Sequence, residues 1–291
     1  METSIIIPVY NDPEGLEVTV DSLLDQTHDD YEIIIADNGS TDSTSDVAEE
    51  FAEIENVYHV IEDRIQTSYA ARNTGIENSS GEIIGFLDAD MYVDSDYVES
   101  ITTKMIEHNR DYMGCEVKLV GDDSIISRYN KASGFPVETF INDSQFAPTN
   151  CLVTRRRVFE TIGYFDERLI STGDVIFGRK AHAAGFELVY EPEITVYHPT
   201  RTELREHISK AIRIGRGREQ IRRFGIDDVS NRSIFHPRNY LPPDPVYFYK
   251  SLSGCYTSPT QIILFYVFSC FIKYCTTYGR IIEFTNPKSI P

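Results

Sequence analysis

Two aspartates separated by one small residue carry the clearest chemical signal in the sequence. Asp88-Ala89-Asp90 directly follows residues 83–87, an apolar run with the length and composition of a buried strand. At a strand end, both carboxylates can face one cation, and Mg²⁺ or Mn²⁺ suits such oxygen ligands. A divalent cation there would bridge a diphosphate and stabilise it as a leaving group. A solvated acidic turn is the alternative, and the position after the strand favours the metal site.

The elements that would position these aspartates alternate between strand and helix. Apolar runs at residues 5–9, 32–35, 57–61 and 83–87 predict strands, and residues 14–24 and 43–51 have helical spacing. This alternation predicts a parallel sheet, in which ligands bind at the carboxyl ends of the strands. Three polar segments follow strands and should meet at that edge: Tyr10-Asn11-Asp12, Asp37-Asn38-Gly39-Ser40 and Asp88-Ala89-Asp90.

The second half of the chain is less regular. We expect helices at residues 94–106, 174–184 and 203–224, a strand at 113–119, and extended segments at 151–153 and 187–190. An apolar run at 262–272 is shorter than the roughly 20 residues that a transmembrane helix needs. It therefore predicts a core helix or one lying on a membrane surface.

The charge of the chain is strongly acidic and unevenly distributed. The 291 residues have a formal net charge of −19, and the first basic residue is Arg64. Such a surface repels nucleic acids and free nucleotides, so we expect no nucleic-acid partner and a cation at any phosphate site. Eight lysines against nineteen arginines, with the acidic excess, also predict adaptation to a high-salt cytoplasm. An ordinary acidic enzyme is the alternative.

The N-terminus and the cysteines bear on the compartment. No leader pattern opens the chain, so we expect a cytoplasmic protein. The cysteines are odd in number and lack CxxC spacing, which predicts free or buried thiols rather than disulfides or a zinc site. The five are Cys115, Cys151, Cys255, Cys270 and Cys275.

Several ordered motifs resemble glycosyltransferase family 2 over about residues 3–200. They are Ile5-Ile6-Ile7-Pro8-Val9-Tyr10-Asn11, Asp37-Asn38-Gly39-Ser40-Thr41-Asp42, Ala71-Arg72-Asn73-Thr74-Gly75, Phe86-Leu87-Asp88-Ala89-Asp90, and two further stretches at 150–156 and 159–167. The resemblance implies an α/β GT-A fold, a Rossmann-like, mostly parallel sheet flanked by helices, here with a C-terminal helical extension. It also implies an inverting transfer from a nucleotide sugar, with Mn²⁺ or Mg²⁺ as cofactor.

The resemblance also assigns residues to the nucleotide sugar. Tyr10 would flank the base and Asp37 would bind its edge, while Arg72 would contact the nucleotide from the loop after the third strand. Asp88 would reach the ribose and Asp90 the metal. A salt bridge to a neighbouring aspartate is the alternative for Arg72. The implied nucleotide-sugar set is Pro8, Tyr10, Asn11, Asp37, Arg72 and Asp88.

An inverting transfer needs a carboxylate base for the acceptor hydroxyl. In the family this base sits in a Gly-Glu-Asp stretch, and the matching residues here are Thr172-Gly173-Asp174. Gly173 replaces the glutamate, but Asp174 keeps the aspartate; a helix-capping role is its alternative. The resemblance also makes His198 a metal ligand, with a structural histidine as the alternative.

A basic island at residues 201–223 has a net positive charge, opposite to that of the chain as a whole, and needs an anionic partner or an acidic neighbour. Arg213, Arg216 and Arg218 lie beside Gly215 and Gly217, so a loop or kink there could close over donor phosphates or an acceptor. The island and the 262–272 run also suggest docking on an anionic membrane and a lipid-linked acceptor. We accordingly divide the chain into a catalytic domain at 1–200 (nucleotide half 1–110, acceptor half 111–200), a basic helical segment at 201–235 and an extension at 236–291 that could associate with a membrane.

These features predict a metal-dependent inverting glycosyltransferase using a UDP- or GDP-sugar. The acceptor stays open among lipid phosphates, lipid-linked glycans, polysaccharides and protein glycans, with a lipid-linked glycan favoured by the C-terminal features. A nucleotidyltransferase is the first alternative, although the Pro8-Val9-Tyr10-Asn11-Asp12 turn lacks the Gly-rich basic loop of that class. A non-catalytic nucleotide-sugar-binding module is the second.

Overall fold

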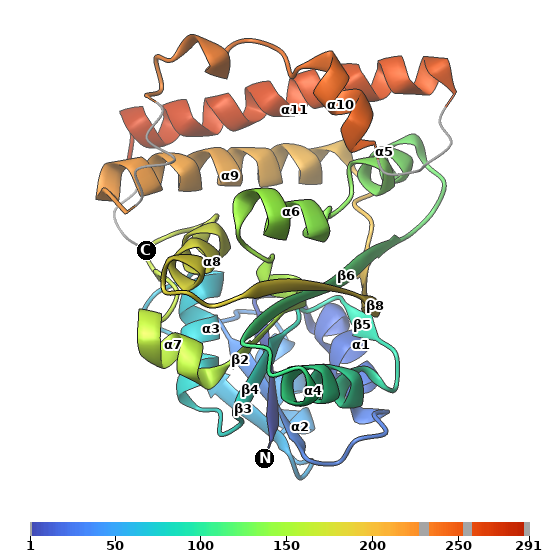
Figure 1. The fold of residues 1–291 in the computed structure, drawn as a ribbon, viewed down its shortest axis with the longest axis vertical. Coiled ribbons are helices and arrows are strands. Elements are labelled where there is room, and N and C mark those ends of the chain that lie inside the picture. Colours follow the sequence, from blue (N-terminus) through green and yellow to red (C-terminus); the bar gives the residue numbers. More distant parts are fainter. Residues whose placement is uncertain (1, 227–232, 253–257, 288–291) are drawn as a thin grey trace.

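The computed structural model describes residues 2–226, 233–252 and 258–287. Its centre is one mixed sheet of eight strands in the order β3-β2-β1-β4-β7-β6-β8-β5. Helices flank this sheet, and a layer of long helices covers one end of it (Figure 1).

The first half of the sheet is parallel, as the alternating pattern predicts. It contains β1 (Thr3–Val9), β2 (Tyr31–Asp37), β3 (Val57–Ile61) and β4 (Ile83–Phe86), connected through α1 (Pro13–Leu24), α2 (Thr44–Phe51) and α3 (Ser68–Glu77). Every residue of β1, β2 and β4 is buried because helices cover both faces, which explains their continuous apolar runs.

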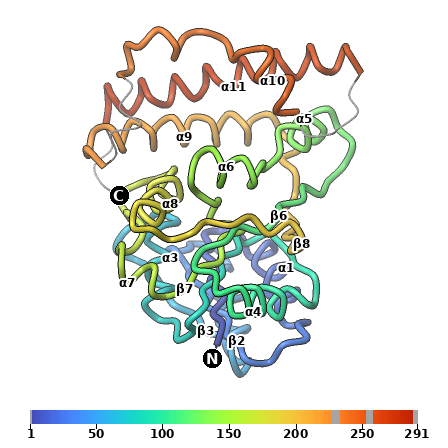
Figure 2. Tube along the Cα trace, in the orientation of Figure 1, coloured from blue at the N-terminus to red at the C-terminus, as the bar shows by residue number. Residues whose placement is uncertain are grey.

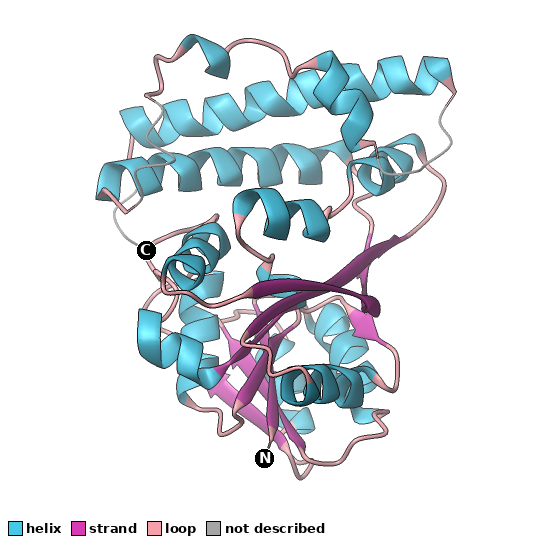
Figure 3. Ribbon diagram, viewed as in Figure 1, coloured by secondary structure: helices cyan, strands magenta, loops and turns pink. Residues whose placement is uncertain are grey.

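The second half of the sheet is mixed. It contains β5 (Tyr92–Val93), β6 (Tyr112–Val120), β7 (Leu152–Arg155) and β8 (Leu188–Pro199). β7 runs antiparallel to both β4 and β6, β6 and β8 are parallel, and β5 is antiparallel to β8. Figure 3 shows the strands of the sheet in magenta among the surrounding helices. The sheet as a whole is therefore less parallel than expected. The α/β class and the GT-A type of sheet are confirmed.

Helices of the second half surround this part of the sheet. They are α4 (Tyr97–Glu107), α5 (Ile125–Ser133), α6 (Val137–Ser144), the 3₁₀ turn η1 (Thr149–Cys151), α7 (Arg156–Ile162) and α8 (Gly173–Ala183). The sequence patterns predict α4 and α8 but miss α3, α5, α6 and α7. Phe177 of α8 packs on Phe159 of α7, 4.8 Å between ring centres, and on Phe165 of the loop that follows α7, at 4.6 Å.

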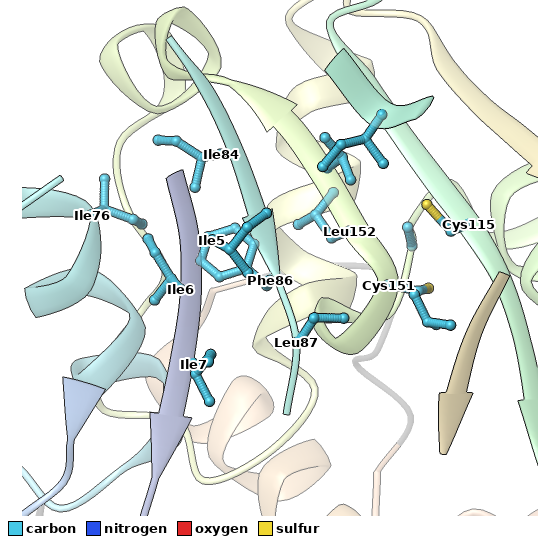
Figure 4. Close-up of a cluster of buried hydrophobic side chains, with 14 of the residues drawn as sticks. Ile5, Ile6, Ile7, Ile76, Ile84, Phe86, Leu87, Cys115, Cys151 and Leu152 are labelled. Carbon is cyan, nitrogen blue, oxygen red and sulfur yellow. The ribbon is translucent and has the colours of Figure 1, made fainter. Parts of the chain in front are cut away.

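A buried apolar cluster joins the two halves of the sheet. Figure 4 shows Ile5 and Phe86 next to Leu152, with the thiols of Cys115 and Cys151 beyond them. Both cysteines are fully buried and unpaired, and burial raises their pKa above the ordinary thiol value. The prediction of buried free thiols is confirmed for these two. Cys255 lies outside the described residues.

A C-terminal layer consists of α9 (Leu204–Phe224), the 3₁₀ turn η2 (Pro237–Asn239), α10 (Pro245–Ser251) and α11 (Pro259–Thr285). α9 and α11 lie side by side, with α6 and α8 between α9 and the sheet (Figures 1 and 2). The two long helices touch through glycines, because a Cβ on Gly215 would collide with the Thr276 carbonyl and one on Gly279 with the Ile212 carbonyl.

The expected loop or kink at Gly215 and Gly217 is therefore wrong. α9 is a continuous helix through both residues, and the absence of side chains there permits close packing instead. A Cβ on Gly217 would lie 2.6 Å from the Ser171 carbonyl oxygen. The glycines thus fix α9 against α11 on one side and against the segment before α8 on the other.

The 262–272 run also belongs to a longer helix than its length suggested. α11 contains 27 residues, and by length and composition it is the one described helix that could cross a membrane. Only 17% of its most apolar 18-residue window is buried within the protein. Its C-terminal half packs on α9, where Glu283 pairs with Arg216 at 2.9 Å and with Arg223 at 3.0 Å.

Candidate active site

A pocket of about 580 Å³ lies at the carboxyl ends of β1 and β4 and continues to α9. Its walls come from the β1–α1 turn, α3, the Asp88 turn, the start of α8, the end of β8 and one face of α9. The chemically active lining residues are Tyr10, Asp12, Tyr69, Arg72, Asp88, Asp174, His198, Arg201, Lys210, Arg213 and Arg218. We refer to this cavity as the catalytic pocket.

Most of the residues singled out from the sequence meet in this pocket. Pro8, Tyr10, Arg72, Asp88, Asp174, His198, Arg213 and Arg218 all line it. Asn11, Asp37, Asp90 and Arg216 do not line it, and the structure gives each of these four a different environment. The predicted convergence of polar strand ends at one edge of the sheet is therefore observed.

Asn11 and Asp37 organise the loop beside the pocket. The Asn11 backbone is left-handed, with φ of 51°, and its side-chain oxygen accepts the Thr41 N–H at 2.8 Å. Asp37 is fully buried; its carboxylate accepts the Ser40 N–H at 2.9 Å and lies 3.8 Å from the His59 ring nitrogen. Although burial opposes ionisation, hydrogen bonds from His59, Ser45 and Ser40 hold the Asp37 pKa far below its usual range.

Arg72 lies on α3 rather than in a loop, which corrects the expected position. Thr67 caps this helix by accepting the Ala70 N–H at 3.1 Å. The Arg72 side chain is nearly buried and forms a salt bridge to Asp88 at 2.5 Å, so the salt-bridge alternative describes the structure. Because both partners line the pocket, the pair also fixes the orientation of the Asp88 carboxylate at its edge.

Asp90 lies just behind the pocket in a strained backbone conformation. Its φ is 100°, and its N–H donates to the Gly15 carbonyl at 3.1 Å and to Thr19 Oγ1 at 3.0 Å. Its Oδ1 is buried and has no hydrogen-bond partner among the described residues. Burial first, then the charges of Asp88 and Asp12, raise the pKa of Asp90 to about 8. A cation beside Asp90 would offset its burial and the repulsion from Asp88 and Asp12.

His198 reaches the same side of the pocket from the end of β8. Its Nδ1 lies 2.7 Å from the Pro199 carbonyl oxygen, so Nδ1 carries the proton and leaves Nε2 as an acceptor. Burial lowers its pKa, which keeps the ring neutral and able to bind a metal. The described residues contain no ready cluster of three or more metal-ligating side chains. The residues therefore fit a cation held by one or two side chains plus substrate phosphate oxygens.

Asp174 lies in the first turn of α8 and faces the pocket. Its Oδ1 accepts the Val175 N–H at 2.9 Å, and burial raises its pKa above the ordinary aspartate value. The residue that caps α8 is Thr172, whose backbone is left-handed with φ of 65°. Asp174 is therefore not the N-cap residue, although its carboxylate accepts one N–H of the first turn while facing the pocket.

Tyr69, which sequence reasoning missed, fixes the position of Asp174. Its hydroxyl accepts the N–H of Gly173 at 2.8 Å and that of Asp174 at 3.3 Å. A Cβ on Gly173 would lie 2.8 Å from two Tyr69 ring carbons, so only glycine fits beneath this ring. Gly173, where a glutamate was expected, thus packs directly against the Tyr69 ring. The only local signal was an aromatic residue shortly before Ala71-Arg72-Asn73.

Basic residues of the C-terminal layer complete the pocket. Lys210 packs 4.6 Å above the Phe135 ring, and burial, followed by the charges of Arg201 and Arg213, lowers its pKa to about 7. The Arg201 N–H donates to Asn130 at 2.7 Å, and its Nη1 is buried without a hydrogen-bond partner within the described parts of the chain. Sequence reasoning placed Arg201 and Lys210 in the basic island but not in the site.

Arg216 is directed elsewhere. It pairs with Glu283 of α11 and does not line the catalytic pocket, so the structure separates it from Arg213 and Arg218. The acidic-neighbour interpretation of the basic island therefore holds for part of it, and the anionic-partner interpretation stays a prediction for the rest. Arg216, Arg222 and Arg223 pair with acidic neighbours, whereas Arg201, Lys210 and Arg213 face the catalytic pocket.

Sequence comparisons with known proteins show which proteins this chain is similar to. A family model described as Glycosyl transferase family 2 matches residues 4–184. The chain is 34% identical over 259 residues to Glycosyltransferase AglE of Haloferax volcanii, covering 86% of this chain and 84% of that protein. It is 37% identical over 108 residues to Glycosyltransferase GlyA of Streptococcus pneumoniae, but spans only 16% of that longer protein.

Solved structures resemble the whole fold. Mannosyltransferase PcManGT from Pyrobaculum calidifontis, in complex with GDP-Man and Mn²⁺, has a TM-score of 0.65 at 17% identity, covering 99% of this chain and 88% of its own. S. aureus TarS 1-349 in complex with UDP-GlcNAc has a TM-score of 0.59 at 17% identity, covering 98% and 92%. With the family model matching residues 4–184 and AglE matching most of both chains, the protein belongs to glycosyltransferase family 2.

Proposed function

We propose that the protein is an inverting, metal-dependent glycosyltransferase that moves a sugar from a UDP- or GDP-sugar to an acceptor hydroxyl or phosphate. The main support for this proposal is that carboxylates and cationic side chains surround one pocket. Asp88 lines the pocket with Asp90 behind it, Arg201, Lys210 and Arg213 line the same pocket, and Asp174 faces the space between them. A nucleotide diphosphate would lie among these carboxylates and cations, with its sugar toward Asp174.

In this proposal Asp174 removes the proton from the acceptor hydroxyl as that oxygen attacks the anomeric carbon. The bond from the anomeric carbon to the diphosphate oxygen breaks at the same time, and attack from the opposite face inverts the configuration. The raised pKa of Asp174 makes it a stronger base than an exposed aspartate. Tyr69 holds the start of α8 through the two N–H bonds it accepts, which fixes the direction of that carboxylate.

The leaving diphosphate gains negative charge as this bond breaks. Lys210 and Arg213 of α9, together with Arg201 from the segment before it, stabilise that charge, since cationic donors in a partly dry pocket act strongly on developing charge. Mn²⁺ or Mg²⁺ at Asp90, with Asp88 and His198 nearby, would also neutralise the diphosphate. The unpartnered Oδ1 of Asp90 supports this assignment.

The nucleoside has its own set of residues in the proposal. Pro8 and Tyr10 flank the base, and Tyr10 is exposed enough to move over it. Asp37 recognises the base edge through the loop that it and Asn11 hold in place. Asp88, oriented by Arg72, binds the ribose.

A lipid-linked glycan on the cytoplasmic face of a membrane is the proposed acceptor. The support is the outer surface of the C-terminal layer, where α11 presents a stripe of exposed apolar and aromatic side chains: Ile263, Val267, Phe271, Tyr274 and Tyr278. The described residues after 232 include four basic side chains and two acidic ones, against an overall charge of −19. This surface replaces the basic island as the contact with anionic lipid, because the island faces the pocket and α11.

The experiment is release of free nucleoside diphosphate from a panel of UDP- and GDP-sugars, with and without Mn²⁺. We expect turnover with one nucleotide class, dependence on the metal, and loss of transfer in Asp174→Asn with donor binding retained. Absence of turnover with every donor, or unchanged transfer in Asp174→Asn, would overturn the proposal.

A further inference from the structure

A second cavity, of about 360 Å³, lies between α9, α11 and η2. Its volume is within the range of small-ligand sites. Four cationic side chains line it, Arg218, Arg238, Lys273 and Arg280, and no carboxylate is among its described lining residues. We refer to it as the basic cavity. It shares Arg218 with the catalytic pocket, whereas Arg238, Lys273 and Arg280 line the basic cavity alone.

The charge of this cavity contrasts with the rest of the chain, which has 46 acidic residues against 27 lysines and arginines. Carboxylates are therefore abundant, and one of the four cavity cations already has such a partner, because Arg280 pairs with Glu219 at 2.9 Å. Arg238 and Lys273 form no ion pair with any residue in 2–226, 233–252 or 258–287. Cations gathered around one space repel one another, and an anion in that space would reverse the effect.

The types of donor in the walls select the class of anion. Guanidinium groups match the oxygens of a phosphate in a forked geometry, and an ammonium group adds a compact charge. The hydroxyls of Tyr129 and Ser269 lie 3.2 Å apart in the wall, so one bonds the other and one O–H is left to donate. The cavity thus offers several charged donors and one neutral donor to a group rich in acceptor oxygens.

We propose that the basic cavity binds a phosphate or diphosphate group. Because Arg218 lines both cavities, an anion bound here also acts on a side chain of the catalytic pocket. This group is either part of a phosphorylated acceptor or a free anion. The assignment to an acceptor rests on the proposed function. The binding site itself rests only on the walls of the cavity.

The test is calorimetric titration of the full chain with inorganic pyrophosphate, without divalent cation. We expect two sites in the wild type. Arg238→Gln/Lys273→Gln should weaken one by about tenfold or more, since each charged hydrogen bond lost contributes substantially. Arg213→Gln should weaken the other. Lys250→Gln is the matched control, because Lys250 is exposed on α10 and lines neither cavity. Affinity and stoichiometry unchanged within twofold in the double variant would overturn the proposal.

Two further measurements distinguish the sources and guard against misfolding. Geranyl diphosphate binding at least tenfold more tightly than pyrophosphate, with that advantage lost in the double variant, would assign the site to a lipid-linked phosphate; equal affinities would assign it to a free anion. Lys273→Arg keeps the charge and should restore binding. If the wild type bound pyrophosphate in the basic cavity but transferred no sugar, the proposed function alone would fail.

Discussion

The contact between Gly173 and Tyr69 gives a sharp test of how the base is positioned. In Gly173→Ala the new Cβ would lie 2.8 Å from two carbons of the Tyr69 ring and 3.0 Å from a third. The ring has little room to retreat, since it is 5% exposed and packs on Phe165 at 5.7 Å between ring centres. Either the ring or the start of α8 must therefore move, and both hold Asp174.

We expect Gly173→Ala to lower the free energy of unfolding by about 1–3 kcal/mol, the usual cost of overpacking a well-filled site. Because the Tyr69 hydroxyl accepts the N–H of Gly173 and of Asp174, the same displacement moves the base. A misplacement of about 1 Å costs roughly 100-fold in rate, so kcat should fall by at least about tenfold. Denaturant unfolding and steady-state transfer assays measure the two effects separately.

Gly185→Ala is the control for lost stability. Gly185 has φ of 91°, and no heavy atom lies within 4 Å of the position that an alanine Cβ would take. Alanine there costs backbone strain of about 1 kcal/mol without touching the pocket. Its kcat should stay at the wild-type value. The reasoning is refuted if Gly173→Ala changes stability by less than about 0.5 kcal/mol with kcat intact. It is also refuted if the effects of Gly173→Ala and Tyr69→Leu simply add, because residues in contact should couple.

Three further predictions follow from buried charge. Asp174→Asn should reduce kcat by about 10²- to 10⁴-fold, and the wild-type kcat should fall on acidification with a midpoint above the ordinary aspartate pKa. Because the pKa of Asp90 is raised to about 8, the native metal-free protein binds more protons than the unfolded chain, and its thermal stability should fall as pH rises from about 4 to 8. Asp90→Asn should flatten this pH profile. Mn²⁺ should raise the melting temperature of the wild type but not of this variant. Glu283→Gln should destabilise by about 3 kcal/mol in denaturant unfolding, because it leaves Arg216 and Arg223 without their buried partner, and a change below about 1 kcal/mol would contradict that role.

Membrane contact can be tested independently of catalysis. Val267 and Phe271 are 55% and 45% exposed on the outer face of α11. Val267→Ser/Phe271→Ser should reduce co-sedimentation with anionic phosphatidylglycerol vesicles and leave nucleotide binding unchanged. Equal sedimentation of wild type and variant, or no preference for anionic over neutral vesicles, would contradict the proposed surface.

The charge of the pocket shows where sequence reasoning needed correction. The absence of any basic residue before Arg64 suggested that a cation would be needed to hold a diphosphate at this edge, and the basic island offered Arg213, Arg216 and Arg218 as further positive charge. The structure brings Arg213 to the pocket, directs Arg216 elsewhere and adds Lys210, because all three lie on α9 but on different faces. No local pattern reports this, since the aspartates of this edge and the α9 cations are more than 100 residues apart along the chain and meet only through tertiary packing.

The sequence by itself determined the alternating β–α half of the fold and the meeting of its polar strand ends. Buried strands need continuous apolar runs and helices need periodic ones, and Ile6 lies in such a buried strand. The carboxyl ends of parallel strands share one edge of the sheet, which is where Asp88 lies. The tertiary structure alone decided which donors surround the chemistry. The Tyr69–Gly173 contact, the turn of Arg216 toward Glu283 and the position of Lys210 each depend on long-range packing that no periodicity encodes.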